Sequence, residues 1–153
     1  MSTQGGIDLP AARASLRQFA VTLSDAASDM AASATTSVGG DIVRRIDGMG
    51  PNPRRVDTGE TRDGWALATF QATNATVGPT SAAPPGGAVG EILTNGKQVR
   101  STLVNLAPQA HYVEDGAPHM RPGYHVRDSS RNLEQHVKMF TDRYMVQAWE
   151  NAG

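Results

Sequence analysis

Apolar residues recur every three or four positions through the first third of the chain. This spacing is typical of one face of an amphipathic helix. Asp8 precedes Leu9 and Pro10, an arrangement that favours an N-cap followed by proline in the first turn. The pattern predicts a helical region over residues 8–47. The members of the stripe are Leu16, Phe19, Leu23, Ala26, Ala27, Met30 and Ala31.

Two glycines interrupt the later part of this region. Gly39 and Gly40 are adjacent, and each glycine costs about 1 kcal/mol relative to alanine in a helix interior. We therefore expect a break or kink there, with Ile42 and Ile46 on a short second helix. Residues 48–53 should end helical structure, because proline removes a backbone donor and biases its predecessor toward extended geometry.

The middle of the chain, residues 56–105, is predicted to hold the strands. Residues 65–70, which begin with Trp65, are predicted as one strand. Residues 91–94 and 97–105 are predicted as a hairpin closed by Asn95 and Gly96, because both central residues of a type I′ turn need positive φ.

A segment rich in Ala, Thr, Pro and Gly separates these strands, over residues 72–90. Pro84 and Pro85 lie near its centre. Loops of this length are uncommon in a compact domain unless they are functional or disordered. The segment therefore either reaches a neighbouring subunit or is mobile.

Helical spacing returns near the C-terminus. Leu133, Val137, Phe140 and Tyr144 keep this spacing, which predicts a last helix over residues 131–149. The whole order indicates an α+β fold: an antiparallel sheet of about four strands, with a long N-terminal helix and a C-terminal helix packed on it. At 153 residues the chain fits one domain, 1–153.

Charge and composition narrow the function. Fourteen Lys and Arg against 15 Asp and Glu give a net charge of -1, so no broad basic field exists to hold DNA or an anionic bilayer. There is no cysteine, which excludes disulfides, thiolate metal sites and cysteine nucleophiles. No stretch approaches the roughly 18 apolar residues of a membrane span, and residues 1–10 lack the pattern of a signal peptide.

Asp57, Thr58 and Gly59 form the tripeptide that carries the catalytic aspartate of aspartic proteases. That chemistry needs two carboxylates about 3 Å apart, each on a tight loop after an apolar strand. Residues 53–56 are not an apolar strand, so a homodimeric protease that uses Asp57 is a remote alternative. The favoured interpretation is a structural turn in which Asp57 accepts backbone N–H groups and Gly59 permits the geometry.

Histidines and acids gather further along the chain, but their spacing matches no metal-ligand pattern. We interpret the histidines of this group as solvated loop residues and His136 as a surface residue of the last helix. No G-x-S-x-G or phosphate-loop motif is present. The arginine pairs at 44–45 and 54–55 could contact DNA phosphates or an acidic partner, but we favour a solubilising role because the rest of the chain is not basic. No catalytic residue, metal or cofactor is predicted. The group comprises His111, Glu114, Asp115, His119 and His125.

Two blocks of sequence resemble the tail-completion or neck proteins of long-tailed double-stranded DNA bacteriophages. The first runs from Val56 through the Asp57-Thr58-Gly59 turn to Trp65, with an arginine at 62. The second contains Asn105, Tyr112, Glu114 and Gly116. The chain departs from that pattern at Glu60-Thr61, at Ala117-Pro118 and in its longer proline-rich loop.

The resemblance implies a structural protein of the virion, assembled in the host cytoplasm. It implies a ring, six-fold in such proteins, that joins the head connector to the tail tube while genomic DNA passes through without sequence-specific binding. Tyr112, Glu114, Gly116, Pro84 and Pro85 are then candidate subunit-interface residues. A tail terminator or another connector or tail subunit, and an ordinary binding domain outside any phage particle, remain alternatives.

Overall fold

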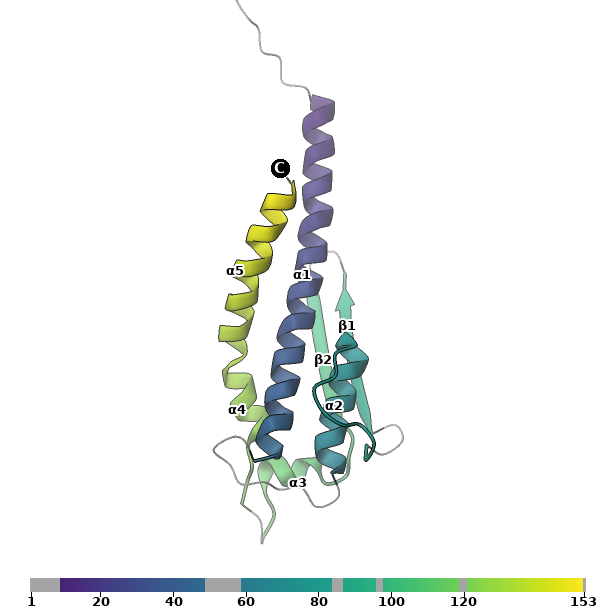
Figure 1. Ribbon diagram of the computed structural model, residues 1–153, viewed down its shortest axis with the longest axis vertical. Coiled ribbons are helices and arrows are strands. Elements are labelled where there is room, and N and C mark those ends of the chain that lie inside the picture. The colour runs from purple at the N-terminus through teal and green to yellow at the C-terminus, as the bar shows by residue number, and fades with distance from the viewer. Residues whose placement is uncertain (1–8, 49–58, 84–86, 96–97, 119–120, 153) are drawn as a thin grey trace, which may run out of the picture.

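The computed structural model describes residues 9–48, 59–83, 87–95, 98–118 and 121–152, and these form an α+β arrangement (Figure 1). One helix, α1 (Leu9–Ile46), runs along most of the molecule. Helix α5 (Leu133–Ala152) lies on one side of it, and α2 (Glu60–Thr73) lies with the sheet on the other. The long first and last helices were predicted. The expected sheet of about four strands is wrong, because the described residues form a two-stranded sheet.

The C-terminal half of α1 supplies the centre of the core. Ile42, Val43 and Ile46 are almost fully buried. By contrast, Leu16 and Val21 in the first half are 68% and 56% exposed. The single helix therefore has a half that is packed on three sides and a half that is largely bare.

Helix α1 continues without interruption through Gly39 and Gly40, so the predicted break is wrong. A Cβ atom built on Gly39 would overlap the side chain of Thr69, which is fully buried on α2. The missing side chain at Gly39 lets the two helices approach closely. Tertiary packing thus stabilises the helix enough to offset the poor helix propensity of this glycine.

Residues 65–70, predicted as a strand, lie instead within helix α2. Glu60 and Asp63 stand in its first turn, where negative charge interacts favourably with the helix dipole. The helix ends at Asn74, which adopts a left-handed conformation with φ 58° and donates its N–H to the Phe70 carbonyl. Small residues such as Ala66 and Ala68 are buried on this helix, and Trp65 is half-buried.

The predicted antiparallel hairpin is confirmed, with β1 (Ala88–Thr94) paired to β2 (Val99–Asn105). The first strand begins three residues earlier than expected. Asn95 donates its N–H to the Gln98 carbonyl and accepts the Gln98 N–H on its side chain. Asn95 does not have positive φ, so it flanks the turn and is not a central residue of it. Gly96 lies outside the described residues.

Three helices complete the described chain. Helix α3 (Ala110–Asp115) and helix α4 (His125–Arg131) are short and lie near the C-terminal end of α1 (Figure 1). Helix α5 begins two residues after the predicted start and extends beyond the predicted end. It is held to α1 by a hydrogen bond of 2.8 Å between Ser33 Oγ and Tyr144 Oη, and by the buried Ala148.

The described part of the predicted long loop packs on the helices. Val77 lies against Gly40, and Gly78 sits so close to Val43 that a Cβ atom there would approach it to 2.9 Å. This part of the segment therefore belongs to the packed structure. Pro84 and Pro85 lie outside the described residues. None of the described helices combines the length and apolar character needed to cross a membrane.

The two adjacent glycines of α1 give opposite predictions. Gly39→Ala should lower the free energy of unfolding by about 1–3 kcal/mol, because the new methyl group collides with buried Thr69. Gly40→Ala should raise it by about 0.5–1 kcal/mol, because a Cβ there meets Val77 at 3.7 Å and gains helix propensity. Urea denaturation followed by circular dichroism measures both. Equal effects of the two substitutions would contradict the close helix contact.

Candidate functional site

The structure places only part of the first predicted block. Asp57 and Thr58 lie outside the described residues, so their role as a turn stays a prediction. Gly59 immediately precedes α2 with φ 83°, a left-handed conformation that favours glycine. Trp65 follows on the second turn of α2 and does not open a strand.

A buried ion pair fixes the start of α2. The Asp63 side chain is fully buried and accepts a hydrogen bond of 2.7 Å from Arg62 Nε and another of 2.8 Å from the Ala82 N–H. Arg62 also reaches Asp47 at 3.3 Å, just beyond the end of α1. The hydrogen bond to Asp63 raises the pKa of Arg62, burial works against it, and the bond to Asp47 adds to the increase. One arginine therefore joins α1 to α2, and Asp63 joins α2 to the following loop.

The second predicted block meets the first in space. Asn105 Nδ2 donates a hydrogen bond of 2.7 Å to the Thr61 carbonyl, and Asn105 Oδ1 accepts the Ala107 N–H. Gly64 lies so close to Asn105 that a Cβ atom would overlap its side chain. Gln109 donates a hydrogen bond to Glu60. The described part of the first block and the beginning of the second are therefore joined by polar contacts between the end of β2 and the start of α2.

The three candidate interface residues of the second block have different surroundings. Tyr112 is 48% exposed on α3, and its ring contacts that of His111 with centroids 3.6 Å apart and planes tilted by 43°. Glu114 is half-buried, and its carboxylate accepts the N–H groups of Val126 and Arg127, each at 2.9 Å. Gly116 ends α3 with φ 87°. Glu114 thus caps α4 within this chain, and the exposed Tyr112 is better placed to meet a neighbour.

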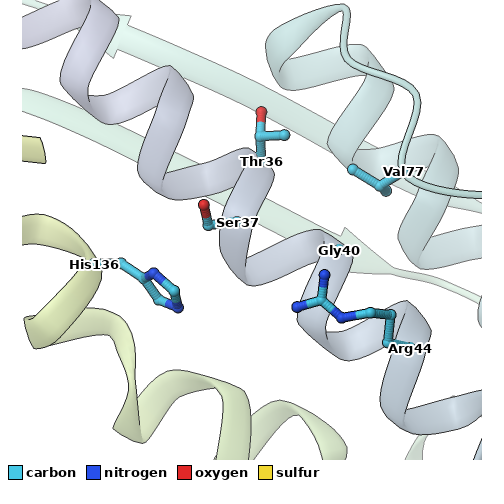
Figure 2. Close-up of a pocket in the computed structure, with 6 residues that line it drawn as sticks. All are labelled: Thr36, Ser37, Gly40, Arg44, Val77 and His136. Atoms are coloured by element: carbon cyan, nitrogen blue, oxygen red, sulfur yellow. The ribbon is translucent and has the colours of Figure 1, made fainter. Parts of the chain in front are cut away.

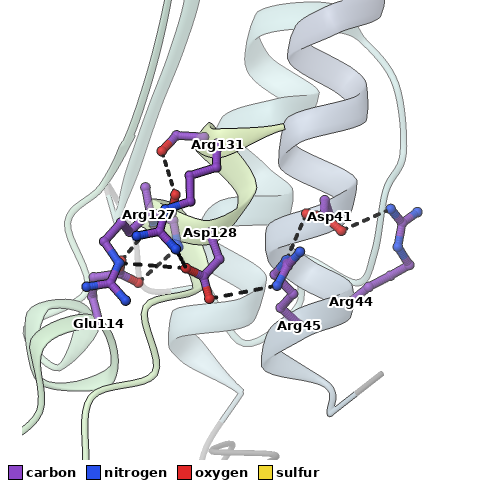
Figure 3. Close-up of polar contacts among 9 residues, drawn as sticks. Asp41, Arg44, Arg45, Glu114, Arg127, Asp128 and Arg131 are labelled. Carbon is purple, nitrogen blue, oxygen red and sulfur yellow. Dashed lines mark hydrogen bonds and ion pairs between the residues drawn. The ribbon is translucent and has the colours of Figure 1, made fainter. Parts of the chain in front are cut away.

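An ion-pair cluster joins α1 to α4 beside this cap (Figure 3). Asp41 accepts hydrogen bonds from Arg45 at 2.8 Å and from Arg44 at 3.4 Å. Arg45 also lies 4.0 Å from Asp128 on α4. Asp128 in turn pairs with Arg127 and Arg131 at 3.6 and 3.3 Å. The arrangement holds α4 against the C-terminal end of α1.

The histidines are not equivalent. His125 was expected to be a solvated loop residue, but it is 1% exposed at the start of α4, so that expectation is wrong. Its ring packs against Gly123, which leaves no space for a Cβ atom there. His119 lies outside the described residues. Among those described, no three or more His, Asp or Glu side chains gather as metal ligands would.

Exposed apolar residues lie near the N-terminal end of α1 and the C-terminal end of α5. Here Phe19 on α1 touches Trp149 on α5 edge-to-face, with ring centroids 6.0 Å apart, yet Trp149 remains 73% exposed. Exposed apolar side chains that lie near one another are candidates for a contact surface in a protein. We call this surface the apolar tip, which comprises Leu16, Val21, Met145, Val146 and Trp149.

The hairpin has a second exposed apolar surface. One of its faces packs on the helices, because Gly90 lies over the Ala68 carbonyl and Ser101 accepts a hydrogen bond of 2.7 Å from Thr35. Residues at the alternate positions point the opposite way. Val89 and Leu93 are 43% and 55% exposed there, and Val89 pairs with Val104. We call Val89, Leu93 and Val104 the outer sheet face.

Neither surface was predicted. Only Leu16 of the apolar tip belongs to the apolar stripe predicted for the first helix. Periodicity identifies one face of a helix without saying what covers that face. The outer sheet face had a usable signal, since valine and leucine at alternate positions of β1 flank Glu91. Apolar residues that stay exposed among the described parts of the chain are the strongest candidates for the function.

Asp41 should make stability depend on pH. Burial alone raises its pKa, but the hydrogen bond from Arg45, with a further bond from Arg44, lowers the pKa below its ordinary 3.8. A carboxyl group with a lowered folded-state pKa stabilises the fold fully above the unfolded value and loses that contribution as the pH falls through the folded value. Asp41→Asn should therefore cost about 1–2 kcal/mol at pH 7 and progressively less below pH 3.8.

Urea titrations of wild type and variant across this pH range provide the measurement. Asp142→Asn, at an exposed position of α5, is the matched control and should show no such convergence. A difference between wild type and Asp41→Asn that stays constant with pH would contradict the role of the Asp41 charge.

Comparison of the chain with protein-family models, with curated proteins and with solved structures finds no match.

Proposed function

We propose that this protein is a structural subunit of the neck or tail top of a long-tailed DNA bacteriophage. In this proposal, copies of the chain form a closed ring, a hexamer by the resemblance, that joins the head connector to the tail tube around the DNA channel. The sequence blocks around Gly59 and Tyr112 are the basis for proposing this family, because they resemble its members. The observation that carries the ring is the presence of two different exposed apolar surfaces on one subunit.

A closed ring needs a heterologous interface, in which one patch of each subunit contacts a different patch of the next. The apolar tip lies on the N-terminal half of α1 and the C-terminal part of α5, whereas the outer sheet face lies on the hairpin beside the packed half of α1 (Figure 1). The first is presented by helices and the second by strands. Two unlike patches favour head-to-tail contact between subunits over a symmetric pair.

The exposed apolar residues of the outer sheet face also favour contact with a neighbouring subunit. A two-stranded hairpin is marginal alone, and an antiparallel sheet with one solvated face normally carries polar residues on that face. Here Val89 and Leu93 occupy it, although Glu91 and Arg100 add charge. Burying a leucine-sized side chain contributes about 1.5–3 kcal/mol, so a neighbour on this face would add stability.

Near-neutral charge fits a channel wall along which DNA slides. The net charge is -1, and dense cationic contacts would hold the phosphate backbone. Tyr112 is an additional candidate contact because it is exposed beside α4. The interface roles of Gly116, Pro84 and Pro85 stay predictions.

A deletion of the gene from its parent phage or prophage tests the proposal. Filled heads should accumulate beside separate tails in electron micrographs, because the joining ring is missing. Tails with an abnormal upper end or an abnormal length would instead indicate a tail terminator, which is the alternative structural role. Normally joined virions would reject both positions.

Complementation of this deletion tests the two surfaces. Leu93→Asp and Val146→Asp should each reduce joined virions by about tenfold or more, since an unpaired carboxylate is costly in an apolar contact. Both positions are more than half exposed, so the isolated subunit should keep its fold. Gln135→Asp, at an exposed position of α5, adds the same charge outside both surfaces and should complement fully.

The same assay separates the protease alternative. Asp57→Asn should complement as wild type does if Asp57 is a turn residue that needs only an acceptor oxygen. Loss of joining by Asp57→Asn, together with cleavage of a virion protein that only the wild type performs, would establish the protease.

A further inference from the structure

An open hollow lies between α1, α5 and the segment that follows α2 (Figure 2). Its volume is about 380 Å³, within the range of small-molecule sites. In Figure 2, the His136 ring points from α5 toward α1, where the Arg44 guanidinium folds back over Gly40. The lining residues are Thr36, Ser37, Gly40, Arg44, Val77 and His136.

The hydroxyl groups in this hollow differ from others on α1. Thr22, Ser28 and Thr35 each donate a hydrogen bond to the carbonyl four residues earlier. Within the described parts of the chain, the hydroxyls of Thr36 and Ser37 form no such bond. Both therefore remain available as donors to a bound molecule.

The His136 side chain is similarly available. Its backbone N–H bonds the Asn132 carbonyl, but among the described residues its ring has no hydrogen-bond partner. An imidazole donates at least one N–H whether neutral or protonated. Its direction toward α1 brings this donor to the same hollow as the hydroxyls.

The charge around the hollow favours an anion. Arg44 pairs with Asp41 at 3.4 Å, but the same carboxylate is bonded more closely by Arg45, at 2.8 Å. Asp41 is therefore shared and does not cancel the charge of Arg44. Among the described residues that line the hollow, Arg44 carries a formal positive charge and none carries a negative charge.

We propose that this hollow binds a phosphate group. Arg44 would supply the charge and the planar donors that match phosphate oxygens, and His136, Thr36 and Ser37 would donate further hydrogen bonds. Gly40 forms part of the floor, where the absence of a side chain leaves room for the ligand. All of these residues belong to one chain, so the site does not depend on ring formation.

Titration of the full-length protein with inorganic phosphate, followed by amide and imidazole NMR shifts, tests the site. Saturable shifts should appear at Ser37, Gly40 and His136, with sodium chloride at matched ionic strength as the reference. Arg44→Gln should weaken the affinity by about tenfold or more, because a charge-assisted hydrogen bond is lost. His136→Phe should also weaken it.

Two further variants separate binding from folding. Arg17→Gln removes the same charge from the exposed first half of the same helix and should change the affinity less than about twofold. Gly40→Ala should weaken phosphate binding while the fold becomes no less stable, because its methyl group meets only ordinary contacts. Equal losses from Arg17→Gln and Arg44→Gln, or no saturable shift at the lining residues, would overturn the proposal.

A short DNA duplex identifies the source of the phosphate. Shifts at the same residues that inorganic phosphate competes away would assign the hollow to the DNA backbone. Phosphate binding without duplex binding would assign it to a free or terminal phosphate group. Duplex binding that leaves the lining residues unshifted and survives Arg44→Gln, in a protein that inorganic phosphate does not shift, would reject the site.

Discussion

The close contact between α1 and α2 at Gly39 and Thr69 is the constraint on which the rest of the structure depends. Because Gly39 has no side chain, Thr69 packs directly against the backbone of α1, and the Ala68 carbonyl on the same helix lies against the hairpin at Gly90. The packed half of α1 is thereby enclosed by α2, the sheet and α5. The other half of the helix extends past these elements with much of its apolar surface exposed.

Polar contacts then fix the connections around this packing. The Asp63 carboxylate is fully buried, which is tolerated because Arg62 and the Ala82 N–H satisfy both of its oxygens. Asn105 and Gln109 hold the end of the hairpin to the first turn of α2. Glu114 caps α4 from a different helix. Residues that looked like a motif in sequence therefore serve largely to join elements within one chain.

The candidate functional surfaces lie away from these internal contacts. The apolar tip and the outer sheet face keep much of their surface exposed among the described residues, and they differ because one is presented by helices and the other by strands. The polar hollow between α1 and α5 is separate from both, because its lining carries hydroxyls, an imidazole and a guanidinium. An assembly role and a phosphate site can thus occupy different parts of the same small subunit without competing for residues.

The sequence by itself determined the elements that depend only on short segments of the chain. These are the first helix, from its apolar stripe, the antiparallel hairpin at Asn95, and the last helix, from its apolar spacing. These follow from backbone geometry and side-chain period, which are properties of short segments. Only the tertiary structure decided whether residues 60–73 form a helix or a strand, because their mixed composition suits either state.

Tertiary structure also turned Gly39 from an expected break into a helix contact and buried His125. It brought Asn105 against Thr61, a pairing that no spacing reveals. Such outcomes depend on which surfaces pack together after the chain folds. A pattern along the sequence does not specify which surface a given residue will contact.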